Sequence, residues 1–157
     1  MRLLLVSDSH GSARNLELLL KRIEEMGKPD AILFAGDGVA DMEWLAGVAP
    51  IHMVTGNRDP YTPGVPAEQL LTFGKADVYL THGDRHRAKI ALSMLAQDAG
   101  SRGAAACVYG HTHVQRADTM AGVLLVNPGA LRSGAYATLD VGPSGELTPS
   151  FHRLEEG

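Results

Sequence analysis

Cysteine is almost absent from this sequence, and so are segments that would direct it into or across a membrane. The single cysteine, Cys107, has no partner in the chain for a disulfide, so a reducing environment is expected. No apolar run approaches the roughly 20 residues that span a bilayer, and the chain opens on a strand-like run at residues 3–6 rather than on a signal peptide. These absences predict a cytoplasmic protein with no membrane partner.

The sequence also lacks charge runs, low-complexity tracts and an excess of basic residues. Its formal net charge is -4, and a surface of that sign does not attract polyanions non-specifically. We therefore expect no nucleic-acid partner except a small nucleotide as substrate. With 45% hydrophobic residues, the chain can bury one substantial core, so residues 1–157 are predicted to form a single domain. Homo-oligomer formation stays open.

The first half of the chain alternates strands with helices. Short buried strands are predicted over residues 3–7, 31–35 and 51–54, because each is an apolar run that stops at a polar or glycine-rich loop. A helix with Ser12 as its N-cap follows the first strand, since apolar residues recur at helical spacing over residues 16–23. Such alternation favours a parallel sheet.

The second half is mostly strand. A hairpin over residues 70–73 and 78–81 leads into a predicted helix whose apolar face runs from Ala88 to Leu95. Gly and Pro turns then separate short strands over residues 105–109, 114–119, 123–126 and 136–141. Two sheets packed face to face with helices outside would accommodate both halves, which indicates the α/β class.

Potential metal ligands gather where the predicted strands end: Asp8, His10, Asp37, Asn57, His82, His111 and His113. Loops at the carboxyl ends of strands in open α/β sheets converge on a crevice, so these side chains can share one site. Imidazoles mixed with carboxylates suit Mn, Fe, Zn or Ni better than Ca. Seven candidates exceed what one ion takes, which predicts two ions that share a carboxylate, roughly 3.5 to 4 Å apart.

Each of these motifs has an ordinary structural interpretation when it is taken alone. Asp8 with His10 is more often a turn with a helix-capping carboxylate, Asp37 can belong to a simple turn, and His111 with His113 can be hydrogen-bonded loop histidines. A chance coincidence of such groups at five strand ends does not explain the pattern well. The metal site is therefore the preferred interpretation, whereas His52 and His152 are assigned to structure.

The order of the motifs points to a family. They are DSH at Asp8, GD at Gly36, GNRD at Gly56, THGD at Thr81 and GHTH at Gly110. Together they resemble the calcineurin-like metallophosphoesterase family, and NPGALR at Asn127 resembles its small YfcE-like and Vps29-like branch. The resemblance implies a four-layer α/β/β/α sandwich of two mixed sheets with flanking helices.

Carried over position by position, the resemblance implies one metal bound by Asp8, His10 and His113, a second bound by Asn57, His82 and His111, and Asp37 bridging them. Two divalent metal ions, with Mn favoured over Fe, Zn or Ni, would lower the pKa of a bridging water, and the resulting hydroxide would attack phosphorus in line. The predicted activity is hydrolysis of a small phosphodiester. The alternatives are a phosphomonoesterase and a Vps29-like protein-binding scaffold with little activity.

The sequence departs from the family pattern at Arg58. In many members the residue after the motif asparagine is a histidine thought to protonate the leaving group, which an arginine with a pKa above about 12 cannot do. Asn57 and Arg58 are assigned to catalysis, with Arg58 clamping phosphate oxygens and Asp59 orienting it. His86 is the next candidate for a general acid.

Other basic residues are left undecided. The basic cluster Arg85, His86, Arg87 and Lys89 fits a solvated helix face at least as well as a nearby phosphate. No catalytic role is assigned to Arg132.

Overall fold

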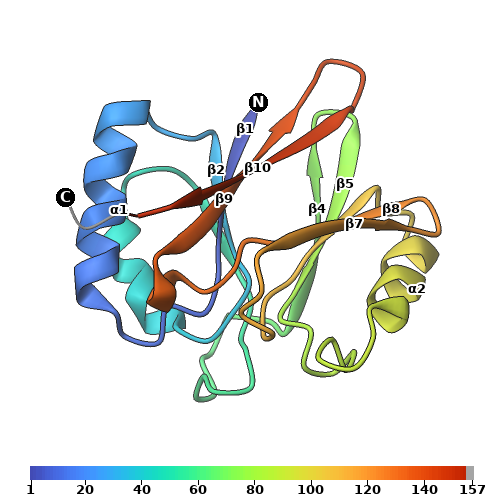
Figure 1. Cartoon of the computed structure of the whole chain (residues 1–157), viewed down its shortest axis with the longest axis horizontal. Coiled ribbons are helices and arrows are strands. Elements are labelled where there is room, and N and C mark those ends of the chain that lie inside the picture. The colour runs from blue at the N-terminus through green and yellow to red at the C-terminus, as the bar shows by residue number, and fades with distance from the viewer. Residues whose placement is uncertain (155–157) are drawn as a thin grey trace.

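Two five-stranded sheets make up the centre of the computed structural model, which describes residues 1–154 (Figure 1). The strands of the first sheet, in spatial order, are β10 (Leu147–Arg153), β9 (Ala135–Val141), β1 (Arg2–Val6), β2 (Ala31–Phe34) and β3 (Ile51–Met53). Those of the second are β4 (Glu68–Phe73), β5 (Ala76–Thr81), β6 (Ala106–Val108), β8 (Val123–Asn127) and β7 (Arg116–Met120).

Both sheets are mixed. In the first sheet β1 pairs with β2 and β2 with β3 in parallel, whereas β9 is antiparallel to β1 and to β10. In the second, β5, β6 and β8 run parallel, and β4 and β7 are antiparallel at the edges. The parallel strands β1 and β2 are almost wholly buried, which explains their continuous apolar runs.

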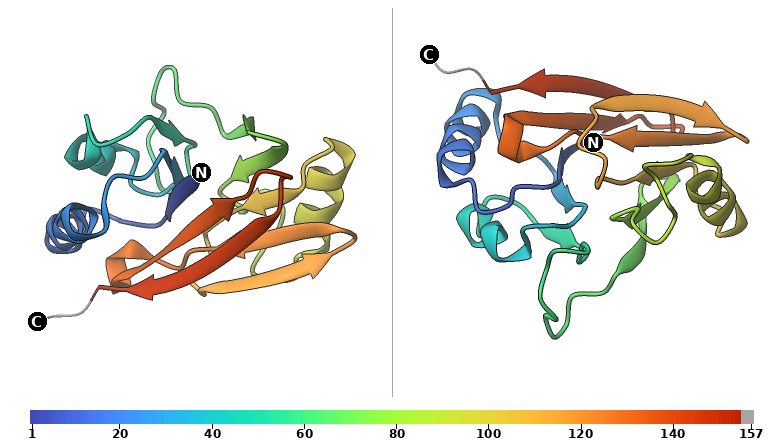
Figure 2. Two further views of the ribbon diagram at one scale, coloured as in Figure 1. Left: turned by 90° about the horizontal axis from the view of Figure 1, so that it is seen from above. Right: turned by 60° about the horizontal axis from the view of Figure 1, so that its bottom comes forward.

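Helices cover the outer faces of the two sheets (Figure 2). Three apolar cores lie between the layers. Helix α1 (Ala13–Met26) and the 3-10 helix η1 (Val39–Leu45) pack on the first sheet, and α2 (Ser93–Ser101) packs on the second. Leu16, Leu19 and Ile23 form the buried stripe of α1, and each fully buried side chain contributes about 1.5–3 kcal/mol. The predicted α/β/β/α sandwich of two mixed sheets is confirmed.

One local prediction was wrong, and two elements were not predicted. Helix α2 begins at Ser93 rather than near Ala88, because the preceding residues form turns and Arg87 has a φ of 53°. Strand β10 was not predicted, and a second short 3-10 helix, η2 (Leu131–Ser133), follows β8. Ser12 occupies the N-cap position of α1, as predicted, although its side chain makes no capping hydrogen bond.

The parallel strands of both sheets end on one side of the molecule, at the bottom of the view in Figure 1. The loops that follow β1, β2, β3, β5 and β6 therefore meet there, although the strands belong to different sheets. None of the helices described within residues 1–154 is both long and apolar enough to cross a membrane.

Candidate metal centre

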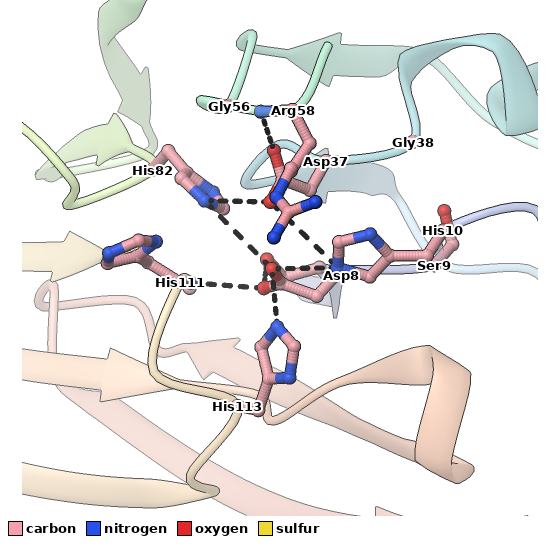
Figure 3. Close-up of polar contacts among 12 residues, drawn as sticks. Asp8, Ser9, His10, Asp37, Gly38, Gly56, Arg58, His82, His111 and His113 are labelled. Carbon is pink, nitrogen blue, oxygen red and sulfur yellow. Dashed lines mark hydrogen bonds and ion pairs between the residues drawn. The ribbon is translucent and has the colours of Figure 1, made fainter. Parts of the chain in front are cut away.

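Five of the seven candidate ligands, Asp8, His10, Asp37, His82 and His113, place donor atoms close together (Figure 3), whereas Asn57 and His111 line the adjoining pocket without belonging to these donor groups. Asp8 and His10 follow β1, Asp37 follows β2 and Asn57 follows β3, all in the first sheet. From the second sheet come His82, after β5, and His111 and His113, after β6. Asp37 and His111, which follow strands of different sheets, line the same pocket.

The carboxylates of Asp8 and Asp37 lie among the imidazoles. Asp8 Oδ1 is 3.2 Å from His113 Nε2, 3.5 Å from His10 Nε2 and 3.9 Å from His82 Nε2. Asp37 Oδ2 is 3.3 Å from His82 Nε2 and 3.8 Å from His10 Nε2. Two triads can each hold an ion, Asp8–His10–His113 and Asp8–Asp37–His82, and in each triad the donor atoms lie within 4.8 Å of one another.

Three of these atoms are buried without a hydrogen-bond partner among the described residues: Asp8 Oδ1, His10 Nε2 and His82 Nε2. Buried polar atoms are nearly always paired, because leaving one unsatisfied costs about 1–3 kcal/mol. Here the unpaired atoms are all potential metal ligands and they converge. The residues present therefore fit divalent cations.

Hydrogen bonds on the far side of each ligand fix its orientation. His82 Nδ1 donates to the carbonyl oxygen of Ala35 at 2.7 Å, so in the neutral ring the lone pair of Nε2 faces the carboxylates. Asp8 Oδ2 accepts hydrogen bonds from the Ser7 hydroxyl and from the His111 amide at 3.1 Å, which directs Oδ1 toward the centre. Such support holds a ligand in place before an ion arrives.

The backbone at the site is strained. Among the described residues, seven other than glycine have positive φ, and five of them are candidate ligands: Asp8, His10, Asp37, His111 and His113. A left-handed residue other than glycine costs of order 1–3 kcal/mol, although Asp and His tolerate it better than most. Because left-handed backbone clusters at functional sites, its concentration here indicates positions selected for function rather than for stability.

Two glycines let the backbone approach the carboxylates closely. A Cβ on Gly110 would lie 2.5 Å from Asp8 Oδ2 and 2.0 Å from Ser7 Oγ, and one on Gly56 would lie 2.2 Å from Asp37 Oδ1. No side chain fits at either position without displacing a candidate ligand.

Asp59 organises the loops instead of orienting Arg58, which corrects the prediction. Its two carboxylate oxygens accept hydrogen bonds of 2.8–3.0 Å from the amides of Asp37, Gly38, Val39 and Gly56. It therefore ties the loop after β2 to the loop after β3. The Arg58 amide donates to Asp37 Oδ1 at 2.8 Å, and its guanidinium is directed toward the cluster in Figure 3.

The mutual field of these groups shifts their pKa values. Burial alone would raise the pKa of Asp37, but His82 beside it and the Arg58 amide outweigh burial and lower it. Burial alone would lower the pKa of His82, but the carboxylates of Asp37 and Asp8 outweigh it and raise it. Burial, together with His82 and Lys89, lowers the pKa of His111, which favours the neutral, ligating imidazole.

A pocket of about 150 Å³ opens over the cluster and is lined by three cations, Arg58, Lys89 and Arg132. Asn57, His10, Asp37, His111 and His113 complete its wall. Sequence reasoning missed Arg132, although the NPGALR motif that contains it was a signal, and it left Lys89 undecided. The Arg132 amide also donates to the Asp8 carbonyl at 3.1 Å, which ties η2 to the first ligand loop.

His86, the next candidate acid, belongs to a different cluster. Its Nε2 is 2.8 Å from Asp98 Oδ2, and it is absent from the residues that line the pocket over the ligands. The two histidines assigned to structure also lie in packing contacts. His52 meets the edge of Phe73, and His152 stacks on Tyr136.

Comparison with known proteins agrees with this geometry. Residues 1–142 match the calcineurin-like phosphoesterase superfamily domain. The chain is 33% identical over 132 residues to the probable metallophosphoesterase YsnB of Bacillus subtilis, covering 84% of this chain and 76% of that protein. It is 28% identical over 135 residues to a probable metallophosphoesterase of Mycoplasma pneumoniae, with coverages of 83% and 79%.

Solved structures share the fold. A predicted phosphoesterase from Streptococcus pneumoniae superposes with a TM-score of 0.76 at 27% identity, covering 99% of this chain and 93% of the other. Vps29 of Entamoeba histolytica, solved in complex with Zn²⁺, gives a TM-score of 0.79 at 20% identity, with coverages of 99% and 100%. At that identity the Vps29 likeness concerns the fold alone. The match over residues 1–142, together with the identity to YsnB, shows that this chain belongs to the calcineurin-like phosphoesterase superfamily.

Proposed function

We propose that the protein is a phosphodiesterase that depends on two divalent cations, with Mn favoured over Fe, Zn or Ni. Members of its superfamily use divalent metals and act on small phosphate esters. The observation that carries the proposal is the convergence of Asp8 Oδ1, His10 Nε2 and His82 Nε2, buried and unpaired within the described residues. The mixture of carboxylate and imidazole suits a borderline transition metal.

In this proposal Asp8, His10 and His113 hold one cation, Asn57, His82 and His111 hold the other, and Asp37 is shared. The distances support the sharing, because Asp37 Oδ2 lies near both His10, of the first set, and His82, of the second. Asp8 Oδ1 also lies within 3.9 Å of His82, which supports a compact arrangement of the two sets.

When bound, the cations would supply the chemistry of water activation and charge neutralisation at phosphorus. The chain itself supplies binding and orientation. Arg58, Lys89 and Arg132 surround the pocket and can hold the phosphate oxygens, and the planar fork of an arginine matches two of them at once. Asp59 fixes the loops that carry Asp37 and Arg58, so that the clamp and the ligand keep their relative position.

The described side chains that line the pocket include no carboxylic acid free for proton transfer, and Arg58 does not release its proton near neutral pH. General acid catalysis is worth roughly 100- to 10,000-fold, so its absence penalises poor leaving groups most. We expect the rate to fall steeply as the pKa of the leaving group rises. A series of aryl and alkyl phosphodiesters measures this slope, and a flat slope would show that another group donates the proton.

A Vps29-like binding scaffold with little activity is the second candidate. It is favoured by the fold likeness to Vps29 and by Arg58 in place of a histidine. The complete set of candidate ligands argues for catalysis, because an incompletely used charged pocket would destabilise a scaffold without benefit. A phosphomonoesterase is the other alternative, since the pocket is open and does not select for a second ester group on the phosphate.

A paired assay separates these candidates. Mn²⁺ is titrated calorimetrically into the wild type, His82→Ala and the control His52→Ala, and each is assayed with a chromogenic phosphodiester and the matching monoester. We expect hydrolysis of the diester and Mn²⁺ binding to be lost in His82→Ala and retained in His52→Ala. If none of the three proteins binds Mn²⁺ or hydrolyses either ester, the scaffold is favoured. If the wild type hydrolyses the monoester faster than the diester, the monoesterase is favoured.

A further inference from the structure

A second pocket adjoins the one over the metal ligands, and Lys89 lines both. It has a volume of about 380 Å³ and lies between the turns that precede α2 and the chain from Tyr109 to Arg116. Ala88, Leu92 and Val114 supply its apolar lining. The mechanism proposed above makes no use of this pocket.

All the polar side chains that line the second pocket are hydrogen-bond donors, and none of its lining residues is Asp or Glu. Lys89 makes no ion pair with any residue among the described 1–154. Thr112 Oγ1 accepts from the Val114 amide at 3.2 Å and from Asn127 Nδ2 at 3.0 Å, so its own hydrogen is left to donate. Arg116 uses Nε and Nη2 to bind Asp118, which leaves Nη1.

Tyr109 adds a buried donor to the same pocket. The residue is fully buried, and its hydroxyl has no well-formed hydrogen bond within the described part of the chain. Its neighbour Asn127 directs its amide hydrogens to the Gly110 carbonyl and to Thr112. An unpaired buried hydroxyl is costly and calls for an acceptor.

The pocket on the other side of the metal ligands differs in charge. It shares His10, Asp37 and Arg58 with the central pocket, but Asp41 and Asp59 also line it. An anion beside the central pocket is therefore favoured on the side of Lys89 and disfavoured on the side of Asp41.

We propose that the second pocket, defined by Lys89, Tyr109, Thr112 and Arg116, binds a second phosphate group of the substrate. The preferred substrate is then a phosphodiester that carries a further, non-reacting phosphate close to the reacting one, as a 3′-phosphorylated nucleotide ester does. This inference rests on the proposed phosphodiesterase function and names its substrate class. Donors without competing acceptors match the oxygens of a phosphate.

The test uses two substrates that release the same p-nitrophenolate, thymidine 5′-(p-nitrophenyl phosphate) and its 3′-phosphorylated derivative. In the wild type the 3′-phosphate is expected to lower KM about tenfold, as for one hydrogen bond to a charged group. The double variant Tyr109→Phe, Thr112→Val removes two donors with little change in shape and should bring the KM ratio close to one. Tyr136→Phe, also a fully buried tyrosine, is the control and should keep the wild-type ratio.

A binding measurement on protein kept metal-free with a chelator gives a readout that does not need turnover. Thymidine 3′,5′-bisphosphate should bind about tenfold more tightly than thymidine 5′-phosphate to the wild type and to Tyr136→Phe, but not to the double variant. Thermal unfolding of all the proteins shows whether each variant is folded.

The outcomes distinguish the two proposals. Equal KM values for both esters in the wild type, or an unchanged ratio in the folded double variant, would overturn the second-phosphate pocket and leave the hydrolase intact. If neither ester is hydrolysed, the proposed function fails, and the binding of the two nucleotides to the metal-free protein then tests the second-phosphate pocket. Preferential binding of the bisphosphate that the double variant loses would support it, and equal binding of the two nucleotides would refute it.

Discussion

Two clusters of histidine and aspartate in the described part of the molecule differ in how their polar atoms are satisfied. Around Asp8 the nitrogen-to-oxygen distances are 3.2–3.9 Å and key atoms are unpaired in the described structure. Around Asp98 the carboxylate accepts from the Tyr79 hydroxyl at 2.9 Å and from Arg102 Nε at 2.9 Å, and it lies 2.8 Å from His86 Nε2.

The Asp98 cluster is also closed by its surroundings. Arg102 lies 4.8 Å above the Tyr79 ring and donates to Glu68, and the single hydroxyl hydrogen of Tyr79 is shared between Asp98 and Glu68. Apart from His86 Nδ1, the buried side-chain atoms of this described cluster are paired. Residue type therefore does not separate a ligand site from a structural network. Unpaired lone pairs that converge mark the first, and short complementary hydrogen bonds mark the second.

The largest expected effect is from Asp8→Asn. The change removes one negative charge shared by both triads, so kcat/KM with Mn²⁺ should fall about 1,000-fold, which corresponds to several kcal/mol of lost charge stabilisation. Because Asp8 is fully buried, the free energy of unfolding measured in chelator should stay the same or rise. Urea unfolding and steady-state kinetics check the two effects. A large loss of stability in Asp8→Asn would show that Asp8, like Asp98, stabilises the fold.

The next effect tests the close backbone approach. In Gly110→Ala the new Cβ collides with Ser7 Oγ and Asp8 Oδ2, so the Asp8 carboxylate must shift. A displacement of about 1 Å is expected to lower kcat/KM about 100-fold. Gly100→Ala in α2 is the matched control, because its nearest foreign atom would be Val123 Cγ2 at 3.7 Å. Comparable losses in both variants would show that the damage is to folding rather than to ligand position.

A smaller effect, in stability alone, is expected from Asp98→Asn. Loss of hydrogen bonds to a charged group should lower the free energy of unfolding at pH 7 by about 2 kcal/mol, with little change in activity. Burial alone would raise the pKa of Asp98, but His86, Arg102 and Tyr79 outweigh it and lower the pKa to about 2.

The pH dependence sharpens this prediction. A carboxyl with a depressed pKa stabilises the fold above its ordinary pKa of 3.8, and the stabilisation is lost as the pH falls toward 2. The difference between wild type and Asp98→Asn in urea unfolding should therefore shrink below pH 4. A difference that stays constant down to pH 2 would assign the effect to packing.

Sequence predicted the layers and brought the right loops together because both depend on local pattern. Continuous apolar runs identified β1 and β2, and polar residues at strand ends marked the site. Strand β10 was missed because Pro149 and half-exposed residues obscure its pattern at the edge of the sheet. That strand forms by long-range pairing with β9, which periodicity does not report.

At the site, the corrections concern hydrogen-bond partners and pocket residues, whereas the assignment of ligands to two metals stays a prediction. Asp59 was assigned to its sequence neighbour Arg58, whereas its oxygens bind amides of the loop after β2 as well as Gly56. Lys89 and Arg132 were not assigned to the site because the pocket that unites them exists only after both sheets have packed. Candidate ligands can be recognised in the sequence by residue type, whereas the contacts that orient them depend on tertiary geometry.

The candidate ligands are divided between two sheets that share no strand pairing among the described residues: Asp8 and Asp37 follow strands of one, His82 and His113 follow strands of the other. What holds the halves at a fixed offset is the apolar layer between them, which includes Leu5 and Val78. A densely packed interior resists sliding of one sheet over the other, so this apolar layer fixes the distance between the candidate ligands of the two sheets. Removal of a methyl group from this layer would change the spacing between the candidate ligands without altering any of them.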